Sequence, residues 1–225
     1  MKDKIRKTAE RTRFFNHLLL PQVNITNEDT SEGRYYTTPS GVFPSVTTRL
    51  GKFYGKEFLE QWRNRVGHEK AERITYQAGL RGTAVHNICE RYLRNEPDYL
   101  LDEPPANAES FRSIQKFLDD NVGDVYGIEL PLYSKFFNTA GRTDLLGSYA
   151  GQKSVIDFKT TRNEKREDWI ESYFVQETVY ALMVEEMYGV KIPQIVTIMA
   201  SDYTPPLIFV KDKSDYVAKA IEIFC

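Results

Sequence analysis

The chain has 225 residues, of which 41% are hydrophobic and 13% aromatic, which suffices for one large packed domain with appendages. Its formal net charge is −2, so the whole surface is not a basic nucleic-acid binder, and any basic footprint must be local. The only cysteines, Cys89 and Cys225, exclude a disulfide framework and a four-cysteine metal site. No run of eighteen apolar residues exists, so we expect no membrane span.

The N-terminal part predicts a helix and a loop ahead of a hairpin. Residues 1–20 are predicted to be helical and basic on one face, and residues 22–34 to form a polar loop. A turn at residues 39–41 between two apolar pairs predicts a hairpin, and Ser45 is a candidate N-cap for the next helix. We expect residues 1–34 to form an N-terminal helix and polar loop, and residues 35–225 to form a single domain.

The remaining elements follow from hydrophobic periodicity. Residues 69–93 predict one or two helices, with Gly79 and Gly82 as possible joints, and residues 98–106 predict a loop. The other predicted helices are 56–66, 108–121, 169–188 and 215–224, and the predicted strands are 125–136, 140–150, 154–159, 195–200 and 207–210. This order predicts an α/β fold with a central mixed β-sheet flanked by helices and an N-terminal helical region.

One predicted strand carries charges that a buried strand does not need. Asp157 and Lys159 lie two residues apart in an otherwise apolar run, so they point to the same face of the strand. Such charges are costly in a core strand unless they have a function. Asp144 can reach the same place from the neighbouring strand. Two carboxylates and a lysine that converge at a sheet edge indicate a divalent metal and hydrolysis of a phosphodiester.

Five elements occur in the order found in a known family. The chain resembles the PD-(D/E)XK nucleases of the RecB-like branch, and within it the small exonucleases of mitochondrial genome maintenance and related phage exonucleases. The resemblance covers roughly residues 35–200 and implies a restriction-endonuclease-like core. Its iron–sulfur subgroup needs four cysteines, so we expect no iron–sulfur cluster. The five elements are Gly82 to His86, Glu129 to Leu132, Gly141 to Asp144, Asp157 to Lys159, and Gln176 with Tyr180.

The resemblance and the chemistry of the donors together predict a metal site. Asp144 and Asp157 supply the carboxylate oxygens that Mg²⁺ prefers, and His86 favours tolerance of Mn²⁺ as well. In the resembled family the backbone carbonyl of the residue equivalent to Phe158 adds another oxygen. Glu129 is either an additional metal ligand or an exposed strand acid, and the sequence does not decide between the two.

The predicted catalytic residues are Asp144, Asp157, Lys159, Gln176 and Tyr180. Lys159 is a compact charge that can hold the attacking water and the scissile phosphate. Gln176 and Tyr180 share one helix face at i and i+4. The resemblance implies that this pair orients the lysine or contacts the DNA backbone.

The predicted DNA contacts are more dispersed. Arg142 and Thr160 are candidates to touch phosphate, although an exposed arginine or a strand-end threonine explains them equally well. Basic residues at 52, 56 and 63 (Lys52, Lys56 and Arg63) fit a helical insertion or arch around residues 45–80 that admits one flexible strand. Tyr36, with Tyr35 and Phe43, is expected either to stack bases or to pack the hairpin.

The resulting functional prediction is a divalent-metal-dependent DNA exonuclease that prefers single-stranded DNA with a free end. Two alternatives stay open, namely a structure-specific endonuclease on the same core and a catalytically idle DNA-binding module. We expect an intracellular, cytoplasmic location, which is the host cytoplasm if the chain is phage-encoded. Protein partners are not predicted.

Overall fold

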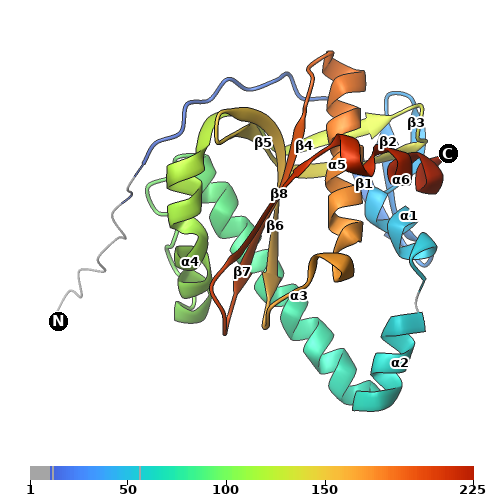
Figure 1. Ribbon diagram of the computed structural model, residues 1–225, viewed down its shortest axis with the longest axis vertical. Coiled ribbons are helices and arrows are strands. Elements are labelled where there is room, and N and C mark those ends of the chain that lie inside the picture. The colour runs from blue at the N-terminus through green and yellow to red at the C-terminus, as the bar shows by residue number, and fades with distance from the viewer. Residues whose placement is uncertain (1–10, 12, 56) are drawn as a thin grey trace.

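The computed structural model describes residues 11, 13–55 and 57–225, with the backbone alone at 57–59. In this part of the chain short strands come first, a run of helices follows, and the long strands come next, so that helices and strands alternate only towards the C-terminal end (Figure 1). The strands are β1 (Thr26–Thr30), β2 (Gly33–Thr38), β3 (Gly41–Pro44), β4 (Val122–Ser134), β5 (Thr139–Tyr149), β6 (Gln152–Thr161), β7 (Gln194–Ser201) and β8 (Leu207–Asp212). The helices are α1 (Val46–Phe53), α2 (Glu57–Val66), α3 (His68–Leu93), α4 (Pro105–Asn121), the 3-10 turn η1 (Glu167–Trp169), α5 (Glu171–Tyr188) and α6 (Ser214–Phe224). Among the described helices, none combines the length and the apolarity needed to cross a membrane.

The main sheet is mixed and has the strand order β4-β5-β6-β7-β8. The first three strands form an antiparallel meander, β7 runs parallel to β6, and β8 returns antiparallel to β7. A parallel neighbour needs a crossover connection, and α5 supplies it between β6 and β7. The predicted mixed sheet is therefore confirmed.

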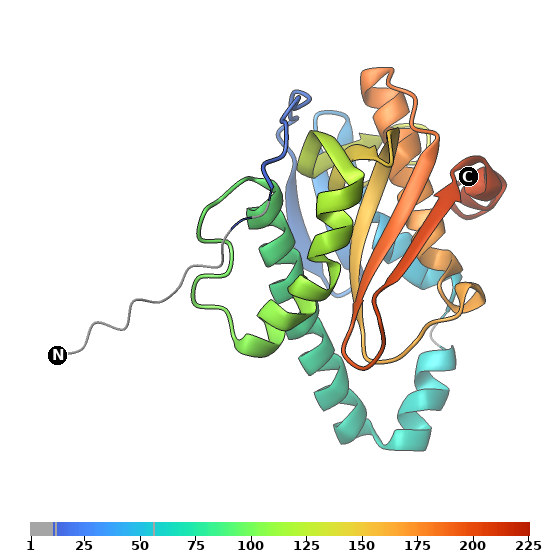
Figure 2. The same ribbon diagram turned by 60° about the vertical axis from the view of Figure 1, so that its left-hand side comes forward.

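Helices cover both faces of this sheet, as the two views show (Figures 1 and 2). On one face α1, α5 and α6 enclose a core that includes Val155 of β6. On the other face α3 and α4 enclose a second core that includes Ile156 and Phe158 of the same strand. Alternate residues of β6 thus enter different cores, as a strand buried on both faces requires.

The segment before the hairpin differs from its prediction. Residues 13–20 are extended rather than helical, and the backbone of Leu18 donates to the carbonyl of Val125 at 2.8 Å. The guanidinium of Arg13 donates to the carbonyl of Asp119, so tertiary pairing outweighs the helical spacing. Residues 1–10 and 12 of the predicted helix lie outside the described residues.

The loop predicted for residues 22–34 is also wrong in part, because Thr26–Thr30 forms β1. This strand pairs antiparallel with β2, and β3 completes a separate three-stranded sheet. All five side chains of β1 are exposed, so the strand carries no alternating apolar pattern by which the sequence could reveal it. The boundary predicted between residues 34 and 35 therefore runs through this small sheet.

The predicted helical arch corresponds to a shorter projection. The helix α3 is continuous, so neither Gly79 nor Gly82 is a joint. Helix α2 and residues 68–80 of α3 extend beyond the sheet as a helical hairpin, which we call the projecting hairpin (Figures 1 and 2). Helix α1 is not part of it, because Val46 and Leu50 are buried in the core under α5 and α6.

Candidate metal centre and active site

The register of β4 and β5 places two acids opposite each other. Ile128 pairs with Leu145 and Leu130 with Thr143, so Glu129 lies across from Asp144. Glu129 has a φ of 49°, in the left-handed region that non-glycine residues rarely adopt. Backbone strain of this kind persists where the surrounding structure imposes it, and it gathers at functional sites.

Helix α3 brings a histidine to this pair of acids. The Nδ1 atom of His86 lies 3.3 Å from Oδ2 of Asp144, and the imidazole packs edge-on against Phe158 at 6.2 Å between ring centroids. One ligand atom from each of His86, Glu129 and Asp144 lies within 4.8 Å of the other two. One nitrogen and two carboxylate donors at this spacing fit a divalent cation such as Mg²⁺ or Mn²⁺. We call these three residues, which form a candidate cation site, the metal centre.

Several ionisable groups lie close together in the metal centre. Burial raises the pKa of Glu129 to about 7, and the nearby carboxylates of Asp144 and Glu90 add to the shift. For His86, burial disfavours the charged form, but the Asp144 carboxylate outweighs it and raises the pKa to about 9. Burial likewise opposes ionisation of Asp144. The charge of His86, together with the hydrogen bonds that the Asp144 carboxylate accepts, nevertheless holds the pKa of Asp144 below the usual range. A divalent cation would relieve the repulsion between the carboxylates.

Asp144 lies where two strands separate. The pairing of β5 with β6 ends at Leu145 and Ile156, and beyond that point the backbone N–H of Phe158 donates to Oδ2 of Asp144 at 2.8 Å. The carboxylate therefore replaces the next rung of the sheet. Oδ2 of Asp144 thus contacts both the Phe158 backbone and the imidazole of His86.

Asp157 and Lys159 lie together on the α5 face of β6, so the prediction that they share a face is confirmed. Their side chains form an ion pair, and the Lys159 ammonium lies 5.1 Å from the centre of the Tyr173 ring. Burial opposes the charge on Lys159, but the carboxylates of Asp157 and Asp144 raise its pKa overall. Burial raises the pKa of Asp157, even though the Lys159 charge opposes this shift.

Helix α5 supplies the partner of Asp157. The side-chain amide of Gln176 donates to Oδ1 of Asp157 at 2.9 Å. Gln176 therefore contacts the carboxylate that pairs with Lys159, and its role in orienting the lysine or contacting the DNA backbone stays a prediction. Among the described residues Asp157 lies outside the three-residue metal centre, so its role as a metal ligand stays a prediction, as does that of the Phe158 carbonyl.

Tyr180 of α5 packs against β5 and is too buried to offer a surface to a DNA backbone. Its side chain is buried, and its hydroxyl lies beside the β5 backbone at Gly141 and Arg142. A Cβ atom at Gly141 would lie 2.6 Å from that hydroxyl, so the contact requires glycine there. Tyr180 thereby positions β5 two residues before Asp144, and the predicted DNA contact of this tyrosine is wrong.

The predicted DNA contacts are spread over several surfaces. Arg142 is exposed, and Thr160 is half-buried beside Gly82 of α3. Lys52 is exposed on α1, outside the projecting hairpin, whereas Arg63 is half-buried on α2 within it. Lys56 lies outside the described residues.

Tyr36 is a core residue and not a stacking surface. It is 5% exposed and packs with Ile25 and Ala140, and Phe43 packs against the same cluster. The hairpin alternates its side chains, and Tyr36 occupies the face that meets the main sheet. Of the two predicted interpretations of this aromatic group, the structure selects packing for Tyr36.

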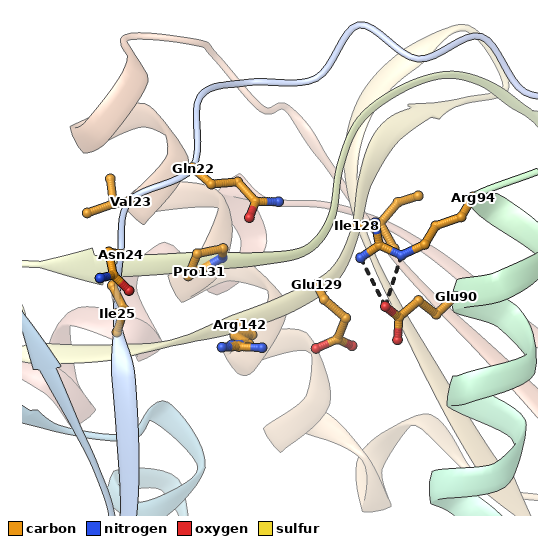
Figure 3. Close-up of a pocket in the computed structure, with 10 residues that line it drawn as sticks. All are labelled: Gln22, Val23, Asn24, Ile25, Glu90, Arg94, Ile128, Glu129, Pro131 and Arg142. Atoms are coloured by element: carbon orange, nitrogen blue, oxygen red, sulfur yellow. Dashed lines mark hydrogen bonds and ion pairs between the residues drawn. The ribbon is translucent and has the colours of Figure 1, made fainter.

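A pocket of about 490 Å³ borders the metal centre (Figure 3). Glu129 belongs to both the pocket and the metal centre. Glu90, one helical turn after His86, pairs with Arg94 at 2.9 Å on the α3 side of the pocket. The pocket is lined by Gln22, Val23, Asn24, Ile25, Glu90, Arg94, Ile128, Glu129, Pro131 and Arg142.

One buried acid of α5 lies next to Gln176 and was not among the residues predicted from the sequence. Glu177 of α5 is 0% exposed, its Oε1 accepts a hydrogen bond from the Thr197 hydroxyl, and its Oε2 has no hydrogen-bond partner among the described residues. Burial raises its pKa well above the usual range, and the nearby Asp157 carboxylate adds to the shift. The available signal was a carboxylate within an apolar helical stretch, directly after Gln176.

Comparisons with known proteins give related sequences. No family model matches the chain. The chain is 31% identical over 143 residues to mitochondrial genome maintenance exonuclease 1 of Homo sapiens, which covers 59% of this chain and 40% of the human protein. The Mus musculus protein of the same name is 27% identical over 129 residues, or 54% of this chain and 38% of the mouse protein. The chain thus spans about two fifths of the length of these relatives.

A solved structure of a candidate exonuclease from Eubacterium rectale also aligns with the chain. It has a TM-score of 0.44 and 18% sequence identity, over 65% of this chain and 63% of that chain. More than half of this chain is similar in sequence to the human and mouse proteins, both of which are named as exonucleases.

Proposed function

We propose that the chain is a divalent-metal-dependent DNA exonuclease of the PD-(D/E)XK type, RecB-like branch, that hydrolyses phosphodiester bonds of single-stranded DNA from a free end. One observation carries the proposal, which is the grouping of His86, Glu129 and Asp144 beside the Asp157–Lys159 pair. The homology to exonucleases supports it.

The proposed cofactor is Mg²⁺, with Mn²⁺ tolerated. His86, Glu129 and Asp144 would hold it, and Asp157 and the Phe158 carbonyl are proposed as further ligands that approach once Asp157 exchanges part of its pairing with Lys159. When bound, a divalent cation neutralises charge on the phosphate and lowers the pKa of a bound water.

The residues of the chain would supply position and charge. Lys159 would place its ammonium beside the scissile phosphate, where positive charge favours the transition state over the ground state. Asp157 and the Tyr173 ring define where that ammonium lies. Gln176 holds Asp157, and Tyr180 holds β5 near Asp144, so both act through the residues they position.

The projecting hairpin supports the proposed preference for a single strand. It extends past the sheet (Figure 2). It follows α3 away from the point where Gly82 meets Thr160, the residue after Lys159. It carries Arg63 and an exposed Tyr76, which is 68% exposed, and the two can contact phosphate and base. With a net charge of −2, general attraction to duplex phosphates is weak, so a locally guided flexible strand is the better substrate.

The decisive experiment compares linear and circular single-stranded DNA of equal sequence with blunt linear duplex, each with Mg²⁺ or with EDTA. We expect mononucleotide release from the linear single strand in Mg²⁺ alone. Cutting of the circle would identify an endonuclease, equal digestion of the duplex would remove the strand preference, and binding without cleavage would indicate an idle module. Cleavage in EDTA would contradict the metal-dependent mechanism.

We also propose a cytoplasmic location inside the cell, or in the host cell if the chain is phage-encoded. The support is the use of cysteine, since Cys89 is buried as a free thiol and Cys225 is exposed.

A further inference from the structure

The pocket beside the metal centre is placed to receive part of the substrate. Glu129 forms a wall of the pocket and also belongs to the metal centre, so a ligand in the pocket would lie next to a bound cation. Figure 3 shows Arg142 and Glu129 close together in this view, with the Glu90–Arg94 pair on the α3 side and Gln22 above.

Arg142 is the pocket cation that is available to a ligand. Arg94 is paired with Glu90 at 2.9 Å, whereas Arg142 is exposed and its side chain makes no ion pair with any described residue. A guanidinium is a planar, permanently charged donor that binds phosphate through two hydrogen bonds.

The other walls fit the rest of a nucleotide. The segment before β1 contributes the side-chain amides of Gln22 and Asn24, which can donate to and accept from any base. Val23, Ile128 and Pro131 add apolar surface for a sugar or a base. A volume of about 490 Å³ lies in the range of small-ligand sites, which suits one nucleotide and not a stretch of duplex.

We propose that this pocket binds the terminal nucleotide of the DNA strand, with its phosphate between Arg142 and the metal centre, and that it retains the nucleoside monophosphate as product. The proposal rests on the proposed exonuclease function and names the subsite that would make the enzyme release single nucleotides. It also predicts competitive inhibition by nucleoside monophosphates.

The test measures binding and does not need turnover. A deoxynucleoside monophosphate, as its 5′ and 3′ isomers, is titrated calorimetrically into the intact protein with Ca²⁺, which balances the acids of the metal centre. The matching nucleoside and inorganic phosphate are titrated in parallel. The variants are Arg142→Gln and Asn24→Asp, and the control is Arg166→Gln, whose arginine is exposed and pairs with Asp168 at 2.9 Å.

We expect saturable binding of at least one isomer, at least about tenfold weaker binding of the nucleoside and of phosphate alone, and a loss of about tenfold or more in both variants. The Arg166→Gln control should bind as the wild type does. Equal affinity of wild type and Arg142→Gln, in samples with unchanged melting temperature, would overturn the subsite. So would phosphate alone binding as tightly as the nucleotide.

The two proposals fail separately. A chain that digests linear DNA but shows no Arg142-dependent nucleotide binding keeps its exonuclease function and loses this subsite. A chain that digests nothing but binds the nucleotide through Arg142 keeps the subsite and loses the exonuclease function.

Discussion

Two groups of charged side chains lie close together in the site, and each balances its charge differently. On the pocket side, Glu129 and Asp144 face each other with His86 as the nearest cationic partner. On the α5 side, Asp157 already has two partners, the amide of Gln176 and the ammonium of Lys159. The first group offers ligand atoms that could bind a metal ion, while the second already contains a cation, the Lys159 ammonium.

The cause of this difference is the cover that each group receives. Helix α5 packs over β6, and the buried charges of Asp157 and Lys159 pair with each other there. On the other side the separation of β5 from β6 and the left-handed backbone of Glu129 leave carboxylates beside a pocket. The paired charges position one another, and Glu129 at the pocket is an acid that a ligand could reach.

The largest effect should follow from removing the pocket-side group. In EDTA, or in Asp144→Ala with Mg²⁺, we expect cleavage of linear single-stranded DNA to fall by about a thousandfold or more, because both remove the cation. Calorimetric titration with Mn²⁺ should show that Asp144→Ala has lost metal binding. The control is Asp168→Ala, an exposed acid paired with Arg166. Normal turnover in Asp144→Ala would place the metal elsewhere.

Removing the lysine of the α5-side group should slow the chemical step and leave metal binding largely intact. We expect Lys159→Ala to lower kcat by about 100- to 1,000-fold, the range for loss of one positioned charge donor in a transition state. Because Lys159 is not one of the metal centre residues, Mn²⁺ affinity should change little. Lys153→Ala, an exposed lysine on the same strand, is the matched control. A large loss of Mn²⁺ affinity in Lys159→Ala would show that the two groups are one unit.

A smaller change removes only the hydrogen bond that Gln176 donates to Asp157. We expect Gln176→Ala to lower kcat by about tenfold, since one hydrogen bond to a charged acceptor is lost while the Lys159 pair remains. The KM for DNA should stay within about twofold, because Gln176 lies behind the site. The control is Gln152→Ala, whose glutamine is exposed at the start of β6, the strand that carries Asp157. A change confined to KM would indicate direct contact with DNA.

The smallest effect on activity is expected for Glu177→Gln. Burial raises the pKa of the Glu177 carboxyl, so the folded state keeps a proton that the unfolded chain releases above its ordinary pKa near 4.3. The free energy of unfolding must then fall as pH rises through this window. Glutamine mimics the protonated acid and removes this dependence. The melting temperature of Glu177→Gln relative to wild type should therefore rise from pH 5 to pH 8 in EDTA.

The control for this prediction is Glu164→Gln, an exposed acid, for which the difference from wild type should not change with pH. A Glu177→Gln variant that loses stability as pH rises would show that the carboxylate is ionised in the fold. In that case Lys159 balances two acids and not one.

The sequence by itself determined the features that depend on local periodicity. The mixed sheet, the shared face of Asp157 and Lys159, and the helix that carries Gln176 and Tyr180 all follow from apolar spacing within single elements. Such features are readable because the pattern of one strand or helix fixes which side chains share a face.

Only the tertiary structure decided the rest, because those features depend on which elements meet. The register of β4 and β5 sets Glu129 against Asp144, and the packing of α3 brings His86 to both. Long-range pairing turns residues 13–20 into an extended segment and buries Tyr36. Contacts between distant segments outweigh local preference when they bury surface or satisfy backbone groups, and no pattern within the segment itself records them.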